Sequence, residues 1–236
     1  MEEMSRHVTI PVFGETWTWG LISVILFGIL LFTVEKRAPS KVRFIHYTVF
    51  VLLVLREIYV QYLDITHNSW TESHSLPLHM CDISRFALMW LLLRFNQNVY
   101  EFLLLLGMPG GIHALLTPEL TDGQGLNYVI DYYLGHGTIV VYPLYFFFAK
   151  KRPIRQRSWL YAFILGNVIM LVVGTINYLL NANYMYLCHR PLAANPLVIG
   201  EWPWYLIGFE IFGFIHIYIL YKLFYYLQQR WQLATA

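Results

Sequence analysis

A histidine, a cysteine and an aspartate lie close together in the segment Leu76-Pro-Leu-His-Met-Cys-Asp82. A cysteine thiolate is a strong nucleophile, and the positive end of a helix stabilises a nearby thiolate. The segment opens a predicted helix, and we expect Cys81 in its second turn, where this field is fading. A thiol paired with a histidine base suits acyl transfer through a thioester. We therefore predict that His79, Cys81 and Asp82 are catalytic.

The spacing of these residues suggests a role for each. His79 and Asp82 are three apart, so they share a helix face and the carboxylate could orient the imidazole. Arg85 is three residues beyond Asp82 and could pair with it. Cys81 lies roughly 200° around a regular helix from His79, which puts its base on another helix. His113 or His136 would serve as that base, and His79 is the alternative if the first turn is not regular.

Three other interpretations of these residues stay open. Cys81 could be a small buried apolar residue, or it could form a disulfide with Cys188, the only other cysteine. His79 could be a hydrogen-bonded structural histidine. The histidines and Asp82 could also bind zinc, but neither an HxxxH nor an HExxH pair occurs on one helix, so we predict no metal and no cofactor.

The elements that position these residues are predicted to be membrane-spanning helices. The chain has 236 residues, of which 58% are hydrophobic and 13% charged, whereas a soluble domain carries about 25% charged residues. A spanning helix needs about 20 mostly apolar residues. We predict one all-α domain, residues 1–236, with seven spans at about 17–34, 44–64, 76–94, 98–116, 129–149, 158–181 and 203–227. Within the fourth span, the segment Gly107-Met-Pro-Gly-Gly-Ile-His113 is expected to interrupt the helix, with a simple kink for packing as the alternative.

The distribution of Lys and Arg predicts the orientation of the helices, because cytoplasmic loops are enriched in both. Only Arg6 and Arg190 lie on one side of the predicted spans. Twelve lie on the other side: Lys36, Arg37, Lys41, Arg43, Arg94, Lys150, Lys151, Arg152, Arg155, Arg157, Lys222 and Arg230. We expect the N-terminus outside, the C-terminus inside, and a multi-pass protein of the cell membrane. The net charge of +2 says nothing useful about nucleic acid, and we predict no nucleic-acid partner.

Most ionisable residues within the predicted spans fall in the outer half of the bilayer, and His216 is the main exception. Such residues are costly in a membrane and often functional, although structural pairs worth about 1 kcal/mol each are the alternative. The inner half is expected to be largely apolar. The clustering favours an outward-facing polar cavity, for which we predict six substrate-binding residues: Glu57, Arg85, His113, Asn177, Tyr178 and Glu210.

Several of these segments resemble the YwaF-type bacterial integral membrane proteins. The matching stretches extend from the third to the seventh predicted helix. They are Leu76-Pro-Leu-His-Met-Cys-Asp82, Gly110-Gly-Ile-His-Ala-Leu-Leu-Thr-Pro118, His136-Gly with Pro143, Asn183-Tyr-Met-Tyr186 with Pro191, and Trp202-Pro-Trp-Tyr205.

That family is similar to the eukaryotic transmembrane protein 164 group. The resemblance implies an acyltransferase that acts on ether phospholipids with a cysteine and a histidine in the membrane. His79 matches the histidine best. The resemblance places the cysteine directly before the histidine, where this chain has Leu78, so Cys81 is the substitute.

We therefore predict an enzyme that transfers or hydrolyses an acyl chain of a membrane lipid at the outer leaflet. In this interpretation Asn177 or a tyrosine donates a hydrogen bond to the oxyanion. The rival prediction is a transport or solute-binding protein with the same cavity and no acyl chemistry. Transport would also need polar residues at the midplane and in the inner half, where the sequence has few.

Overall fold

The computed structural model describes residues 8–120, 125–190 and 200–235, so Arg6 and Pro191 lie outside the described residues. The predicted all-α fold is confirmed: the described residues are mostly helical, and the only strands among them are the two-residue antiparallel pair β1 (Val8–Thr9) and β2 (Glu119–Leu120). The chain divides into two compact units, Met1–Arg56 with Ser84–Arg152, and Glu57–Ile83 with Pro153–Ala236. The first is called unit 1 and the second unit 2.

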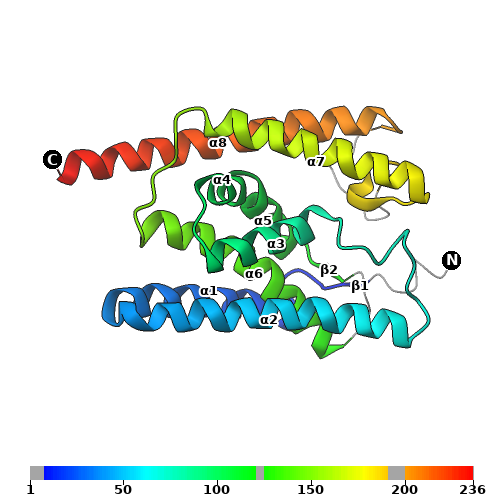
Figure 1. The fold of residues 1–236 in the computed structure, drawn as a ribbon, viewed down its shortest axis with the longest axis horizontal. Coiled ribbons are helices and arrows are strands. Elements are labelled where there is room, and N and C mark those ends of the chain that lie inside the picture. Colours follow the sequence, from blue (N-terminus) through cyan, green and yellow to red (C-terminus); the bar gives the residue numbers. More distant parts are fainter. Residues whose placement is uncertain (1–7, 121–124, 191–199, 236) are drawn as a thin grey trace. The chain divides into compact units, whose positions relative to one another are not determined.

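Two helices pass from one unit to the other. They are α2 (Pro39–Thr66) and α3 (Met80–Leu93). The remaining helices of unit 1 are α1 (Glu15–Arg37), α4 (Gln97–Phe102), the π-helical η2 (Leu103–Gly107), α5 (Met108–Leu116) and α6 (Leu126–Phe148). Those of unit 2 are α7 (Ser158–Leu180), the short 3-10 turn η3 (Tyr184–Tyr186) and α8 (Trp204–Thr235) (Figure 1).

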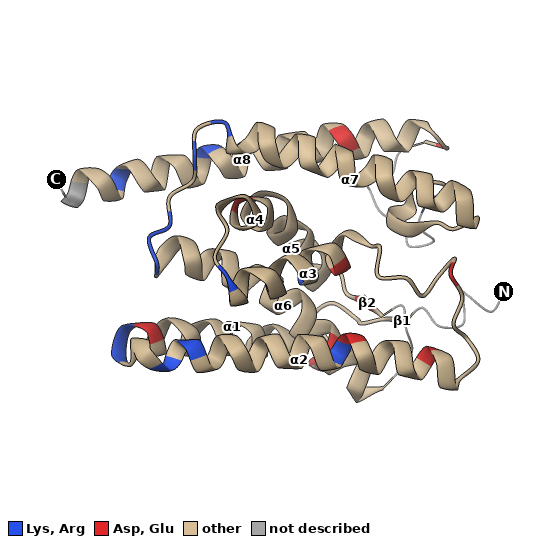
Figure 2. Cartoon of the chain, in the orientation of Figure 1, with Lys and Arg blue, Asp and Glu red and all other residues tan. Residues whose placement is uncertain are grey.

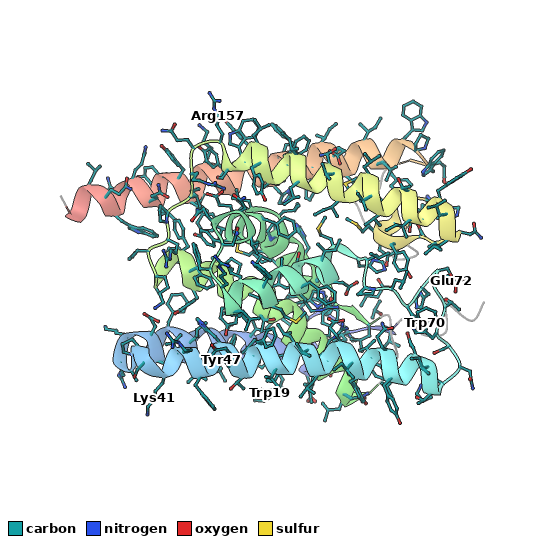
Figure 3. The ribbon with its side chains drawn as sticks, in the orientation of Figure 1. Trp19, Lys41, Tyr47, Trp70, Glu72 and Arg157 are labelled. Carbon is teal, nitrogen blue, oxygen red and sulfur yellow. The ribbon has the colours of Figure 1, made fainter. Side chains whose placement is uncertain are left out.

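The long helices expose apolar side chains that a water-soluble protein would bury. On α1, Leu26 is 58% exposed, and on α7, Leu171 is 72% exposed. Figure 3 shows Trp19 of α1 and Tyr47 of α2 pointing outward from unit 1. Extended apolar faces of this kind require a solvent other than water. By length and composition, four helical segments in the described part of the chain can cross a membrane: Glu15–Arg37, Gln97–Leu116, Ser158–Leu180 and Trp204–Leu233.

In unit 1, α6 packs against both α1 and α5, and glycines permit the close approach. A Cβ atom at Gly137 of α6 would come within 2.6 Å of the Val24 side chain of α1. At Gly111 of α5 it would come within 3.0 Å of Val140 and 3.3 Å of the His136 carbonyl oxygen. The glycines beside His136 therefore admit neighbouring protein segments. Gly135, for example, accommodates the aliphatic part of Arg85.

The predicted interruption of the fourth span is wrong, because the helix from Gln97 to Leu116 is continuous. The chain instead passes through the π-helical turn η2 directly before Pro109, which lies in the first turn of α5. A proline has no backbone N–H to donate, and a local change in hydrogen-bond register accommodates that loss without breaking the helix. The predicted separation of the third and fourth helices is confirmed at Asn96, whose side chain caps α4 through the N–H groups of Asn98 and Val99.

In unit 2, α7 packs against α8, and the turn η3 folds back on the end of α7 (Figure 1). Trp159 of α7 contacts Phe214 and Tyr218 of α8 edge-to-face. Tyr184 of η3 lies in an apolar cluster with Val173, Ala182 and Leu187. These contacts hold the segment that borders the predicted catalytic residues of unit 2.

Candidate functional site

His79, Cys81 and Asp82 lie where α3 begins, but that beginning differs from the prediction. The helix starts at Met80, whereas we predicted a span from about residue 76. Pro77 cannot donate a backbone hydrogen bond, and Leu78 N–H bonds to the Leu76 carbonyl at 2.8 Å in a tight turn. His79 is the N-cap residue, because its carbonyl oxygen accepts from Ile83 N–H at 3.1 Å. Cys81 therefore lies in the first turn of α3, where the helix field is strongest.

The side chain of Asp82 caps the same end of α3. Its Oδ2 atom accepts the backbone N–H of His79 at 2.9 Å, as the acidic third residue does in a capping box. The predicted contact of Asp82 with the imidazole was a side-chain contact, whereas this one is to the backbone. This hydrogen bond fixes the backbone of His79 and so helps to orient its imidazole ring.

The imidazole of His79 packs against η3. Its ring lies 5.6 Å from the ring of Tyr184 and 5.8 Å from that of Tyr186, measured between centroids. The backbone N–H of Met185 donates to Nδ1 of His79 at 3.3 Å. This region, formed by the start of α3 and η3, is the candidate site of unit 2.

The backbone of η3 is strained. Met185 and Tyr186 have φ angles of 57° and 55°, in the left-handed region that residues with a side chain rarely adopt. Each such residue costs roughly 1–2 kcal/mol, and the conformation persists only where its surroundings enforce it. Strain of this kind concentrates at functional sites, which supports a functional role for the candidate site.

Three polar side chains enforce the turn. Asn177 is 1% exposed, and its amide donates to the Tyr184 carbonyl at 2.8 Å and accepts the Tyr184 N–H at 2.9 Å. Tyr205 donates to the Tyr186 carbonyl at 2.7 Å. Tyr184 itself donates from its hydroxyl to the Glu72 carbonyl at 2.9 Å and accepts the Leu76 N–H at 2.9 Å. Burial and the nearby Asp82 raise the pKa of Tyr184, so its phenol stays protonated and keeps donating.

The residues of unit 2 that we predicted to bind substrate lie in different environments. The amide of Asn177 serves the backbone of η3, as described above. Tyr178 is 86% exposed and points away from the protein interior. Glu210 of α8 accepts a hydrogen bond from Asn167 of α7 at 3.1 Å, which makes it an interhelical contact. Glu57 is half-buried on α2.

Both cysteines lie in unit 2, and no disulfide joins them. Asn183 organises the chain around Cys188 by accepting the N–H groups of Cys188 and His189 on its Oδ1 atom, at 3.0 and 2.9 Å. The thiol chemistry predicted for Cys81 therefore remains available in this structure. Within the described residues, no group of three or more His, Cys, Asp or Glu side chains is arranged to hold a metal ion.

In unit 1, His136 of α6 has a defined hydrogen bond. Its Nδ1 atom lies 2.9 Å from the Tyr132 carbonyl oxygen, and its ring packs against the Tyr132 ring at a tilt of 40°, with centroids 4.2 Å apart. A carbonyl oxygen can only accept, so Nδ1 carries the proton and the neutral ring has its lone pair on Nε2. That is the tautomer a general base acting through Nε2 requires. His113 of α5, by contrast, is an exposed residue.

Unit 1 also contains an ion pair within the helices that sequence reasoning missed. Arg56 of α2 binds Asp131 of α6 through two hydrogen bonds of 2.6 and 2.9 Å, with both side chains largely buried. Arg85 of α3 is 4% exposed and passes over Gly135.

A second polar group in unit 1 was also missed, near the end of α1. Glu35 accepts a hydrogen bond from Tyr145 of α6 at 2.6 Å and binds Lys150 at 2.8 Å. His46 of α2 packs among the rings of Tyr142, Tyr145 and Phe146. Glu35 and Lys150 directly follow the predicted spans 17–34 and 129–149, and His46 lies near the start of the predicted span 44–64, so this polar group lies at the ends of predicted spans. The sequence offered one signal, an acidic residue directly before the basic pair Lys36-Arg37.

The helical fold, the exposed apolar faces and the polar groups between helices define an α-helical membrane protein. The model of the TMEM164 family matches residues 6–221, and the chain belongs to that family. The relationship to the transmembrane protein 164 group that the motifs indicated is thereby confirmed. Neither a curated protein nor a solved structure matches the chain.

Proposed function

We propose that this protein is a membrane enzyme that transfers or hydrolyses an acyl ester of a lipid at the outer leaflet of the cell membrane, with Cys81 as the nucleophile. The observation that carries the proposal is the position of Cys81 in the first turn of α3, between His79 and Asp82. Backbone N–H groups and the helix dipole stabilise a thiolate at that position. Membership of the TMEM164 family and the implied acyltransferase activity of its eukaryotic group support the same chemistry.

The topology that accompanies this proposal has seven spans, with the N-terminus outside and the C-terminus inside. Support comes from the Lys and Arg residues that flank the helices. Figure 2 shows such residues gathered where α1 ends and α2 begins; Lys36 and Arg37 lie in the last turn of α1, and Lys41 and Arg43 lie near the start of α2. Positive residues of this kind favour the cytoplasmic side. In this topology the start of α3 faces the outer leaflet.

The test is a comparison of lipid composition in cells that express the protein or its variants. We expect Cys81→Ala to abolish the change in phospholipid and lysophospholipid acyl chains that the wild-type protein produces. Cys188→Ala is the matched control, because it removes the other thiol and is expected to leave that change intact. Folding is checked by the detergent-solubilised yield and the melting temperature. A folded Cys81→Ala variant that changes the lipids as the wild type does would exclude the proposed nucleophile.

One observation favours the alternative, a transport or solute-binding protein without acyl chemistry. The Glu35–Tyr145–Lys150 group lies where the first and fifth predicted spans end, and transport would need polar residues on that side as well. Buried Nε2 of His46 and the hydroxyl of Tyr142 make no hydrogen bond within the described residues, and a polar solute or water would satisfy such atoms. Transport would be favoured if His46→Phe reduced solute uptake into vesicles while Cys81→Ala left it unchanged.

A further inference from the structure

We propose that His79 acts in the acyl reaction as a hydrogen-bond donor through Nε2, held in that state by the N–H of Met185, and that it is not the general base. This inference rests on the proposed function and assigns a role to a residue whose role the sequence left open.

The direction of one hydrogen bond determines the tautomer of His79. The Met185 N–H can only donate, so Nδ1 of His79 must carry the lone pair. A neutral imidazole with a lone pair on Nδ1 has its proton on Nε2. A proton on Nδ1 would bring two N–H groups face to face over 3.3 Å. The contact therefore selects the tautomer that presents an N–H from Nε2, the nitrogen remote from the backbone.

The Met185 N–H group that donates to Nδ1 of His79 is held in place by its surroundings. The Met185 N–H belongs to a turn with two successive left-handed residues, and Asn177, Tyr184 and Tyr205 bind the backbone or the neighbouring chain around it. The rings of Tyr184 and Tyr186 flank the imidazole. Asp82 fixes the backbone of His79 from the other side. These contacts also hold the His79 ring, so its Nε2–H group is preorganised. A preorganised hydrogen-bond donor stabilises developing charge without the cost of reorganisation.

His136 provides the contrast. Its Nδ1 faces a carbonyl oxygen where Nδ1 of His79 faces an N–H, so the two histidines take opposite tautomers. His136 keeps the lone pair on Nε2 that a base needs, whereas His79 has a proton there. Each assignment follows from a hydrogen bond within one unit.

With this tautomer, acyl transfer proceeds through a thioester on Cys81. A general base takes the thiol proton, and Cys81 Sγ attacks the ester carbonyl carbon. The C–S bond forms, the π pair moves to the carbonyl oxygen, and that oxyanion accepts a hydrogen bond from His79 Nε2–H, which keeps its proton. Collapse gives the thioester and expels the lysolipid alkoxide, which recovers the proton from the base. Water or a lipid hydroxyl then attacks the thioester by the same steps, which restores the thiol and releases the acyl product.

His79→Gln separates the two roles, because an amide can donate a hydrogen bond but cannot take up a proton at neutral pH. Loss of one oxyanion donor lowers rates by about 10²–10³-fold. We expect His79→Ala to lose activity on this scale and His79→Gln to recover at least about tenfold of it. The readout is acyl turnover by the purified protein in phospholipid vesicles. If His79→Gln is as inactive as His79→Ala while both remain folded and Cys81→Ala is also inactive, the donor role is wrong and the proposed enzyme stands.

A second measurement reads the tautomer itself. Protein labelled with 15N-histidine is examined by NMR in detergent micelles, and the His79→Gln variant identifies the His79 signals. We expect an unprotonated Nδ1 and a protonated Nε2 in the wild type. Protonation of Nδ1 instead would overturn the proposal. Because this spectrum needs no substrate, it decides the tautomer even if Cys81→Ala proves fully active, a result that would refute the enzyme and the catalytic role of His79 together.

Asn177 and Tyr184 are positioning residues in this account, and the same spectrum tests them. Asn177→Leu removes both hydrogen bonds to the backbone of Tyr184. We expect His79 in this variant to show a mixture of tautomers. The exposed neighbour is the control, because Tyr178→Leu should leave the His79 signals unchanged. An unaltered His79 spectrum in folded Asn177→Leu would show that the turn does not set the tautomer.

Discussion

At the scale of single residues, neighbours in the sequence have opposite environments. Asn177 is buried against the backbone of η3, whereas Tyr178 is exposed. We predicted the same substrate-binding role for both. Sequence position and residue type cannot show whether a side-chain amide hydrogen-bonds to the protein backbone or to a ligand. The pair Arg56 and Asp131 was missed for a related reason: the two residues are 75 positions apart, and depth in the membrane indicates no partner.

The hydroxyl of Tyr184 should contribute measurably to stability. It joins the Glu72 carbonyl to the Leu76 N–H, so Tyr184→Phe leaves two backbone groups without that partner. We expect a loss of about 1–3 kcal/mol in the free energy of unfolding. Thermal unfolding in detergent measures it. Tyr178→Phe makes the same chemical change at an exposed residue and should stay within about 0.5 kcal/mol of wild type. Equal effects of the two variants would contradict the assigned role.

The Arg56–Asp131 pair should be more costly to break than to replace. Removal of one partner from a largely buried ion pair leaves an uncompensated charge and costs about 3–5 kcal/mol. We expect Arg56→Met and Asp131→Leu each to destabilise the protein strongly, and the double variant to be destabilised less than the sum of the two. A double-mutant cycle on unfolding free energies measures this coupling. Additive effects would show that the pair contributes nothing as a unit.

At the scale of elements, the sequence predicted where helices are and missed how they begin and bend. Hydropathy placed blocks near all the long helices because each needs about 20 apolar residues. It could not show that α3 begins at Met80, since that depends on Pro77 and on Asp82 reaching back to His79. Nor could it show the π turn η2, because Pro109 predicts a broken helix as readily as a bulged one.

Two adjacent glycines of α5 provide a matched test of the α5–α6 contact. A Cβ atom at Gly111 would meet Val140 and the His136 carbonyl, whereas at Gly110 it meets nothing within 4 Å. We expect Gly111→Ala to destabilise the protein by about 1–3 kcal/mol through overpacking. Gly110→Ala should be neutral or stabilise it by up to about 1 kcal/mol, because alanine favours a helix. The melting temperatures of the two variants decide this, and a similar loss in both would indicate that the close contact is absent.

At the scale of the whole molecule, the number of membrane crossings depends on which of the helices span the bilayer. Four helical segments meet the length and hydropathy requirement, whereas seven predicted spans follow from including charged or tyrosine-rich helices. Three predicted spans lie outside these four segments. The helix α3 has 14 residues, fewer than a spanning helix needs, and the helices α2 and α6 carry Arg56 and Asp131, which pair with each other. The hydropathy of a single helix does not include such a pairing.

The position of the C-terminus distinguishes the two counts. Seven crossings place the termini on opposite sides of the membrane, whereas four place them on the same side. We expect a green fluorescent protein fused after residue 236 to fluoresce and alkaline phosphatase fused there to be inactive, since the C-terminus is predicted inside. An N-terminal epitope tag should be accessible from outside in intact cells. Both termini on one side would exclude an odd number of crossings.

The π turn η2 has a consequence for the length of the chain. A π turn contains one residue more than the α-helical path between the same two ends. Deletion of one of its leucines, from Leu103 to Leu106, can therefore convert the turn to regular helix and leave both flanking faces in phase. The same deletion in α7 or α8 would rotate everything beyond it by about 100°. Among natural homologues, we therefore expect single-residue gaps to gather at this turn.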